Sequence, residues 1–402
     1  MASKLEPRCP YFGTCGGCDL QDIPYSEQLL MKQRWVEDSL KQHGVAVAVD
    51  PTLGMEDPWF YRNKIQFPIR EMNNQLIMGY FKRGTHEIVN IQECYIQDPY
   101  LTEIAQVSRE VFQKRGLSAY DEKTGKGLLR HFIGRSGFNT SEMLLGIVVN
   151  AKGIPAAFTV ADEIKKRERL MQRQYSRHND YPEPDRKKKI VGIVQNVNTS
   201  RGNVILGQQT TNLLGISFFR ERLGGFKFDV QLHSFFQNNP VQAEVLYNLV
   251  AEYADLNGTE LVVDAYAGIG TIAFWLCQSA LSVIGIEENE SAVKDSVRNL
   301  RLNEISNIKM IKGSVEKDLP KKADVMVLDP PRSGCSERAL RAVLKSRPSR
   351  IIYVSCNPKT LGRDLAHLEA GGYETKNLTP VDMFPQTNHV EAVALLLPSA
   401  RS

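Results

Sequence analysis

Residues 261–271 read Leu-Val-Val-Asp-Ala-Tyr-Ala-Gly-Ile-Gly-Thr. An apolar, β-branched run ends in Asp264, and Gly268 and Gly270 then predict a tight turn into a helix. Ligands of open α/β sheets bind outside the carboxyl ends of the strands, and glycines at such a turn let a ligand approach the backbone closely. The stretch therefore predicts both an α/β fold and the place of a ligand site.

From about residue 234 onward, short apolar strands alternate with helices. This alternation implies right-handed crossover connections, so we expect a Rossmann-like, doubly wound parallel sheet over residues 234–402. The predicted strands are 260–264, 282–287, 308–311, 325–328 and 350–355, with two more around 373–396, and the predicted helices are 240–253, one from Ser291, and 336–344.

Residues 1–231 have a different sequence pattern. Three cysteines lie in a loop-rich start, and mostly strands are predicted after residue 60. We expect a cysteine-bearing region over residues 1–98 and, overlapping it, a central α+β region over residues 60–231. A helix should run from Ser26, a good N-cap, to about His43. Its predicted apolar stripe is Leu29, Leu30, Trp35, Val36 and Leu40; the other predicted elements are helices 99–115 and 155–178, and strands 64–70, 75–81, 128–133, 142–149 and several within 190–231.

The bulk composition is that of an ordinary globular protein, with 402 residues, 42% hydrophobic and 24% charged. The sequence has no run of 18 apolar residues and no apolar leader, so we expect no membrane association and a cytoplasmic protein with reduced thiols. Residues 162–189 carry ten Lys or Arg against six Asp or Glu. They predict either a solvated helix and loop or a surface that follows phosphates. No protein partner is evident, and we expect a monomer.

An acid follows the glycine turn where a ribose ligand is expected. Glu287 ends the next predicted strand, 23 residues after Asp264, and could accept both ribose hydroxyls of a nucleoside. The turn lacks the third glycine of the dinucleotide fingerprint, and no basic residue is placed to bind a pyrophosphate. S-adenosylmethionine therefore fits better than a nicotinamide dinucleotide. The alternative is a purely structural turn.

The strand at 325–328 ends in Asp329-Pro330-Pro331-Arg332. The two prolines fix an extended backbone that directs groups into the crevice. Several nucleic-acid methyltransferases have an acid or amide before Pro-Pro here, and those that act on exocyclic amines usually have an aromatic residue next. Arg332 in that position favours a different target atom.

Residues 351–358, Ile-Ile-Tyr-Val-Ser-Cys-Asn-Pro, place Cys356 at the mouth of another strand. A thiolate that adds to carbon 6 of a pyrimidine makes carbon 5 able to attack a methyl group, after which a base must remove the proton on carbon 5. Cys356 is the candidate nucleophile. Glu391 begins an otherwise apolar strand, where loss of water should raise its pKa toward that of a usable base. The alternative for Cys356, and our interpretation of Cys277, is a buried core residue; we assign Cys335 no role.

Several short motifs occur together along the chain. They are Cys9-x5-Cys15-x2-Cys18, Phe60-Tyr61-Arg62-Asn63-Lys64, Ser234-Phe235-Phe236-Gln237, Asp264-Ala265-Tyr266-Ala267-Gly268-Ile269-Gly270, Asp329-Pro330-Pro331-Arg332, Ser355-Cys356-Asn357-Pro358 and His389-Val390-Glu391. Jointly they resemble the RNA uracil-5-methyltransferases that use S-adenosylmethionine, over nearly the whole chain. Many members begin with a small β-barrel RNA-binding domain; because the cysteine motif starts at residue 9, we expect none here.

The resemblance implies a role for each matching residue. Cys356 corresponds to the nucleophile that forms a covalent adduct with carbon 6, and Glu391 to the general base. The positions that match the cofactor and target pocket are Gln237, Tyr266, Glu287 and Asp329, beside the turn of Gly268 and Gly270.

Four cysteines could form an inorganic site. Cys9, Cys15 and Cys18 are close in sequence, and Cys94 lies far downstream. Four thiolates can hold a [4Fe–4S] cluster or a zinc ion, and plain structural cysteines are the third alternative. The iron–sulfur subgroup of the resembled family has this three-plus-one arrangement, so the resemblance implies a [4Fe–4S] cluster at Cys9, Cys15, Cys18 and Cys94.

RNA is the expected partner, and aromatic side chains among cations suit single-stranded RNA. The alternative is that these aromatics are core residues of alternating strands. The candidates on the small sheet are Phe60, Arg62, Lys64, Arg130 and His131, with Tyr61, Phe81, Lys82, Arg83, Phe132 and Arg135 near them.

We therefore expect an enzyme that methylates carbon 5 of a uridine in structured RNA. The iron–sulfur subgroup suggests 23S ribosomal RNA, and the T-loop of transfer RNA is the second possibility. The rival functions are methylation of a base amine, for which Cys356 would be dispensable, and a non-catalytic RNA-binding protein with an iron–sulfur module.

Overall fold

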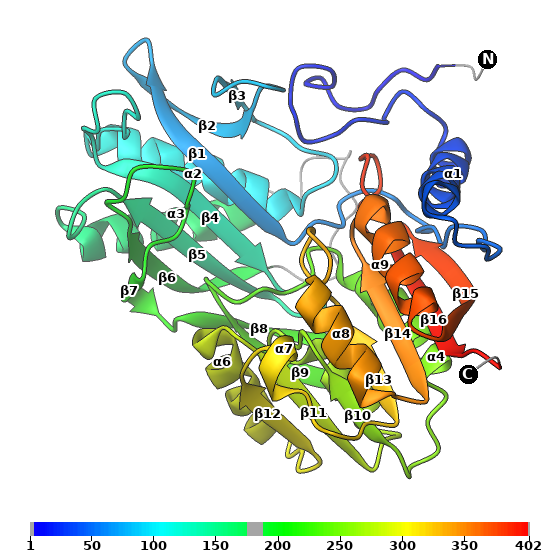
Figure 1. The fold of residues 1–402 in the computed structure, drawn as a ribbon. Helices are drawn as coiled ribbons and strands as arrows, with labels where there is room; N and C mark the ends of the chain where they lie inside the picture. The colour runs from blue at the N-terminus through cyan, green and yellow to red at the C-terminus, as the bar shows by residue number, and fades with distance from the viewer. Residues whose placement is uncertain (1–3, 175–187, 401–402) are drawn as a thin grey trace.

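The structure, a computed structural model, describes residues 4–174 and 188–400. Its strands form two seven-stranded sheets joined through a small two-stranded sheet (Figure 1). The basic stretch predicted near residues 162–189 lies partly outside the described residues, as does the end of the helix predicted over 155–178. None of the described helices, which Figure 1 labels, is long and apolar enough to cross a bilayer.

The first sheet has the strand order β3-β2-β1-β4-β5-β6-β7. Most neighbours are antiparallel, and β5 and β6 are parallel. Helices α2 (Pro99–Lys114) and α3 (Ala157–Gln174) cover one face, where they bury an apolar core with the odd-numbered residues of β1. The strands are β1 (Lys64–Met72), β2 (Gln75–Phe81), β3 (Ile88–Asn90), β4 (Leu129–Ser136), β5 (Glu142–Val149), β6 (Lys189–Val197) and β7 (Gln209–Gly215).

The second sheet has the order β12-β11-β10-β13-β14-β16-β15, which confirms the expected doubly wound fold. The five strands from β12 to β14 are parallel, as expected, but β16 runs antiparallel to both of its neighbours. Only antiparallel neighbours can be joined by a short loop, and residues 382–390 make that connection. The strands are β10 (Leu261–Asp264), β11 (Ser282–Glu287), β12 (Ile308–Lys312), β13 (Val325–Leu328), β14 (Arg350–Ser355), β15 (Tyr373–Val381) and β16 (Glu391–Pro398).

Helices cover both faces of the second sheet. One face carries α4, α5 and α6, and the other carries α1, α8 and α9. Their bounds are α1 (Tyr25–His43), α4 (Pro240–Ala254), α5 (Thr271–Leu276), α6 (Glu290–Leu302), the short α7 (Val315–Asp318), α8 (Glu337–Ser346) and α9 (Pro358–Ala370).

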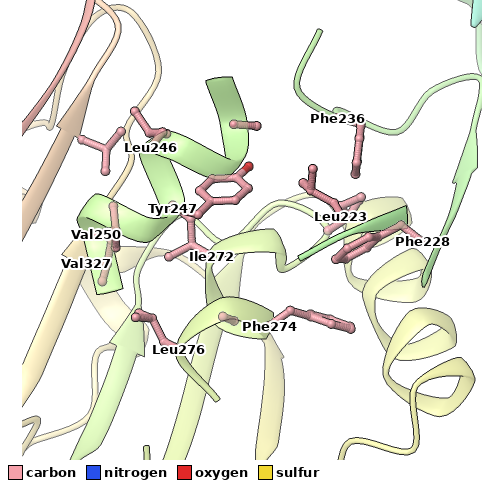
Figure 2. Close-up of a cluster of buried hydrophobic side chains, with 14 of the residues drawn as sticks. Leu223, Phe228, Phe236, Leu246, Tyr247, Val250, Ile272, Phe274, Leu276 and Val327 are labelled. Atoms are coloured by element: carbon pink, nitrogen blue, oxygen red, sulfur yellow. The ribbon is translucent and has the colours of Figure 1, made fainter. Parts of the chain in front are cut away.

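One apolar core is shared between the two sheets. The hairpin of β8 (Phe218–Leu223) and β9 (Phe226–Gln231) packs its aromatic rings on α5, as Figure 2 shows for Phe228 and Phe274, whose ring centroids are 5.0 Å apart. The same buried cluster contains Leu144 of the first sheet and Val327 of the second. Burying each such ring contributes about 1.5–3 kcal/mol, so the two sheets are held in one arrangement.

Helix α1 differs from its prediction. It begins at Tyr25 after Pro24, so Ser26 lies inside the helix and caps nothing. Leu30 is 52% exposed, and the buried positions instead include two polar residues, Gln28 and Lys32. The predicted stripe was wrong there because these polar side chains have buried partners that no local sequence pattern reveals.

Candidate active site

A cleft of about 1100 Å³ opens beyond the carboxyl ends of β10, β11, β13 and β14. Parallel strands bring these ends to one edge of the sheet, so residues far apart in sequence meet there. Gly270 is the one cofactor candidate outside the lining, since it caps the start of α5 with a φ of 89°. The predicted residues that line the cleft are Gln237, Tyr266, Gly268, Glu287, Asp329, Cys356 and Glu391.

Cys356 occupies the mouth of β14. The strand ends at Ser355, and the next helix begins with Asn357 as N-cap, whose side chain accepts from the backbone N–H of Lys359 at 3.2 Å. Ser355 is paired with Ala392 in the antiparallel ladder of β14 and β16. Cys356 follows the one and Glu391 precedes the other, so the register brings the candidate nucleophile and base side by side.

Burial governs the ionisation of this end of the cleft. Glu391 is buried, which raises its pKa to about 7. Burial, and then the charge of Glu391, raise the pKa of Asp329 to about 8. The pKa of the Cys356 thiol is raised to about 11 by burial and by both acids, against a smaller lowering effect of Arg332. A carboxyl group that titrates near neutral pH is well matched to general base catalysis.

Glu287 lies at the other end of the cleft, beside the glycine turn. Its carboxylate accepts the backbone N–H of Gly268 at 2.9 Å and that of Asn289 at 2.7 Å. Gly268 has a φ of 55°, a conformation that disfavours residues with a side chain. The turn and the acid therefore form one unit, with a carboxylate held where a ribose could donate to it.

The structure shows contacts and residues at the cleft that the sequence did not predict. Arg332 Nη2 lies 2.7 Å from His389 Nδ1, which joins the loop after β13 to the loop before β16. Cys335, to which we had assigned no role, is buried in the cleft wall, with its sulfur 3.6 Å from the Tyr266 hydroxyl. Helix α9 adds Arg363 and His367 to the lining of the cleft. Their spacing of four residues places them on one helix face, and this spacing could have indicated from the sequence that they act at one site.

The four cysteines of the expected cluster line one small cavity. Burial, with smaller contributions from the nearby Cys9 and Cys15, raises the pKa of the Cys94 thiol to about 12. In the described part of the chain, no three His, Cys, Asp or Glu side chains form a group that could hold a single metal ion. The cysteines that face this cavity are Cys9, Cys15, Cys18 and Cys94.

Two of the predicted RNA contacts lie in the interior. Phe60 is 9% exposed and Arg130 is 3% exposed. Arg130 Nη1 donates to the carbonyls of Asn198 and Ser200 at 2.8 and 2.6 Å. The packing interpretation therefore fits Phe60 and Arg130 better than RNA binding.

The other three candidates remain predictions. Arg62 packs on the Tyr80 ring, with 6.0 Å between the guanidinium and the centroid. Lys64 and His131 are partly exposed on the face of the first sheet opposite α2. Burial, with Arg135 and Arg62 nearby, lowers the pKa of Lys64 to about 7. Among the described residues, the charged groups that shift the pKa of Lys64 are the cations Arg135 and Arg62, with no carboxylate among them.

Comparison with known proteins gives the family. The sequence model of the tRNA (uracil-5-)-methyltransferases matches residues 222–399. An uncharacterized RNA methyltransferase from Halalkalibacterium halodurans is 42% identical over 401 residues, covering 98% of this chain and 83% of the relative. A further RNA methyltransferase, from Clostridium tetani, is 40% identical over 402 residues, with the same coverage of both chains.

A solved structure extends the similarity to the fold. The Pyrococcus abyssi tRNA (uracil-54, C5)-methyltransferase, crystallised with S-adenosyl-L-homocysteine, superposes with a TM-score of 0.74 and 27% identity. The match covers 96% of this chain and 86% of that one, so it extends over most of both sheets. The family model, the relatives and the solved structure agree, so the chain belongs to the tRNA (uracil-5-)-methyltransferase family.

Proposed function

We propose that this enzyme transfers a methyl group from S-adenosylmethionine to carbon 5 of a uridine in structured RNA, giving 5-methyluridine. The observation that carries the proposal is the meeting of Cys356 and Glu391 in one cleft with Gly268 and Glu287. A thiol and a carboxyl group with a pKa near 7 stand at one end, and a nucleoside-type site stands at the other. A methyl transfer without a covalent intermediate, such as methylation of a base amine, would not need this combination.

The cofactor end suits a nucleoside. The Glu287 carboxylate could accept the ribose hydroxyls, as in other open α/β sheets. The similar Pyrococcus abyssi enzyme was solved with S-adenosyl-L-homocysteine, which supports this assignment. When bound, the cofactor supplies an electrophilic methyl group on a sulfonium sulfur.

The chemistry follows from the two residues at the other end. The base leaves its stack to reach the cleft. Cys356 gives its proton to water and forms a bond to carbon 6, and the electron pair of the 5,6 double bond moves to carbon 5 and the neighbouring carbonyl. Carbon 5 then takes the methyl group, whose bond to the cofactor sulfur breaks to leave S-adenosyl-L-homocysteine. Glu391 removes the proton from carbon 5, the double bond reforms, and the bond to Cys356 breaks.

RNA containing 5-fluorouridine tests this mechanism directly. Fluorine on carbon 5 cannot leave as a proton, so a stable covalent adduct should accumulate with the wild-type protein and cofactor. The Cys356→Ala variant should form none, while Cys277→Ala, which changes a buried thiol in the core next to α5, should form as much as wild type. Undiminished methyl transfer by Cys356→Ala would refute the mechanism.

We propose 23S ribosomal RNA as the substrate, on the resemblance of the cysteine motif. A transfer RNA is the second candidate, which the similarity to the Pyrococcus abyssi tRNA enzyme favours. Mass mapping of 5-methyluridine in both RNAs, from cells with and without the gene, separates the two. Loss of the modification from transfer RNA alone would contradict the ribosomal assignment.

The cysteine cavity is proposed to hold a [4Fe–4S] cluster. Four thiols around one cavity supply the ligand set. A four-iron cluster is larger than one ion, so its thiolates stand farther apart than the ligands of a single metal. This is compatible with a cavity that forms no single-ion site among the described residues. Zinc and plain structural cysteines are the alternatives.

A further inference from the structure

Residues 382–390 form the loop that ends at the candidate base. The loop connects β15 to β16, and Glu391 is the first residue of β16, paired across the ladder with Val381. The loop also carries His389, which contacts Arg332 of the loop after β13. Glu391 is therefore held on one side by the β14–β16 register, next to the Ser355–Ala392 pair, and on the other side by this loop.

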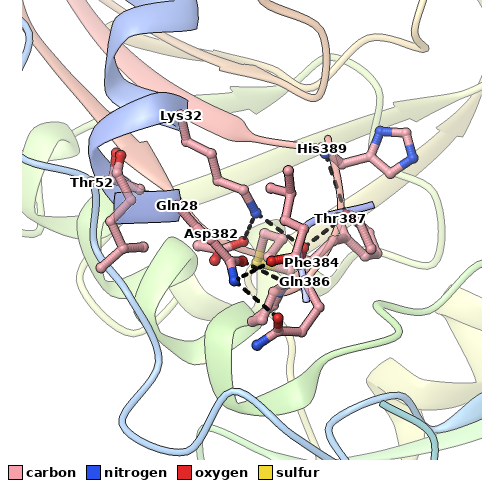
Figure 3. A network of polar contacts seen from close by, with 12 residues as sticks. Gln28, Lys32, Thr52, Asp382, Phe384, Gln386, Thr387 and His389 are labelled. Atoms are coloured by element: carbon pink, nitrogen blue, oxygen red, sulfur yellow. Dashed lines mark hydrogen bonds and ion pairs between the residues drawn. The ribbon is translucent and has the colours of Figure 1, made fainter. Parts of the chain in front are cut away.

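Helix α1 holds the start of this loop through a buried ion pair. Lys32 Nζ donates to Asp382 Oδ1 at 2.5 Å and to the carbonyl of Phe384 at 3.1 Å (Figure 3). Both side chains of the pair are 0% exposed. The Tyr25 hydroxyl donates to the other carboxylate oxygen of Asp382 at 3.0 Å. Asp382 thus has both oxygens satisfied by α1.

A second set of contacts from the same helix holds the middle of the loop. Gln28 Nε2 donates to Gln386 Oε1 at 3.0 Å, and the Gln386 N–H donates back to Gln28 Oε1 at 3.2 Å (Figure 3). Gln386 has a φ of 68°, which costs about 1–3 kcal/mol for a residue with a side chain and persists only when its surroundings impose it. The backbone N–H groups of Asp19 and Leu20 also donate to the Gln386 carbonyl.

None of these α1 side chains lines the cleft. A charge that is fully buried outside the cleft still needs a reason, because a well-packed apolar pair is often as stable. The contacts of Lys32 all fall on the segment that leads to Glu391. On the basis of the proposed function, we infer that Lys32 is a positioning residue for Glu391, acting through Asp382 and the backbone of Phe384.

The inference predicts a defect in one step of the reaction. Glu391 acts only after methyl transfer, so a displaced loop should leave the bond to Cys356 formed and slow its breakage. With ordinary uridine RNA, Lys32→Met should lower kcat by about 100-fold, the size expected for a catalytic group misplaced by about 1 Å. Covalent protein–RNA adduct should accumulate on denaturing gels, with unchanged RNA affinity.

Two further variants make the test decisive. Tyr25→Phe removes only one hydroxyl and should accumulate adduct to a smaller extent; if Lys32→Met does not fold, this variant decides the matter. Lys188→Met breaks another buried ion pair, at 2.5 Å, between the residue before β6 and Asp98, the N-cap of α2, and should lose stability without accumulating adduct. Adduct at the wild-type level in Tyr25→Phe and in folded Lys32→Met would overturn the inference.

A last comparison separates this inference from the proposed function. Glu391→Gln should accumulate the same adduct whether or not Lys32 positions the loop. If Glu391→Gln gives adduct and the α1 variants do not, only the role of Lys32 is wrong. If Glu391→Gln gives none, the proposed base fails, and the inference fails with it.

Discussion

Burial, and after it the carboxyl group of Glu391, raises the pKa of Asp329, so these two acids at the Cys356 end of the cleft cannot both ionise freely. Burial alone raises the pKa of Glu391 to about 7. An acid that prefers to be neutral in the folded protein is useful for catalysis near neutral pH, but it destabilises the fold whenever it is charged.

The first prediction concerns this cost of Glu391. The pKa of Glu391 in the folded protein, about 7, lies above the ordinary value of 4.5. The free energy of unfolding is therefore highest below about pH 4.5 and falls as the pH rises through about 7. Glu391→Gln cannot ionise and should increase the free energy of unfolding at pH 8 by about 2–3 kcal/mol. Urea unfolding at pH 8 and pH 4.5 measures this. An equal gain at both pH values would contradict the explanation.

The second prediction concerns Glu287 at the cofactor end. Glu287→Gln removes a charged acceptor at the proposed ribose site and weakens its bond to the Gly268 N–H. Because hydrogen bonds to charged groups contribute about 1.5–3 kcal/mol, the Kd for S-adenosyl-L-homocysteine should rise by about 10- to 100-fold. Isothermal titration calorimetry measures it.

Its control is Glu252→Gln, which changes an exposed acid on α4, outside the cleft. That variant should bind as wild type does. If Glu287→Gln also keeps the wild-type Kd, Glu287 does not receive the ribose, and the nucleoside site must be built differently.

The third prediction concerns Lys64, whose pKa is lowered to about 7. A bound phosphate would raise that pKa, so RNA affinity should be highest below pH 7 and fall as the pH rises above it. Lys64→Met should weaken RNA binding, reduce the slope of log affinity against log salt by about 0.7, and remove this pH dependence. Filter binding across salt and pH measures all three, with Lys321→Met, an exposed lysine, as the unaffected control.

The cleft could be predicted from sequence because its signals are local and end at strands. Asp329 and Cys356 each directly follow an apolar strand, and parallel strands align their ends at one edge. The antiparallel turn of β16 was not visible in this way. The antiparallel register of β14 and β16, and not the sequence motif itself, places Glu391 beside Cys356.

The RNA face was harder to predict because burial depends on the far side of each strand. Alternation along β1 and β4 puts Phe67 and Phe132 in the core but leaves Lys64 and His131 partly exposed. Arg130 stands at a register shift between Leu129 and His131, where an irregular residue can redirect its side chain. No sequence pattern predicts such a bulge. None predicts that Lys32, in an ordinary helix, contacts a buried acid 350 residues away.

The fourth prediction concerns the cysteine cavity. Protein purified without oxygen should contain about four iron and four sulfide per chain and absorb broadly near 400 nm. Cys94→Ser should lose that iron, because it removes one of the four thiols that line the cavity. Cys277→Ser should keep all of it, since Cys277 is buried in the core at the end of α5. One zinc per chain in place of iron would favour the rival ion, and neither metal in freshly purified protein would leave the four thiols as structural residues.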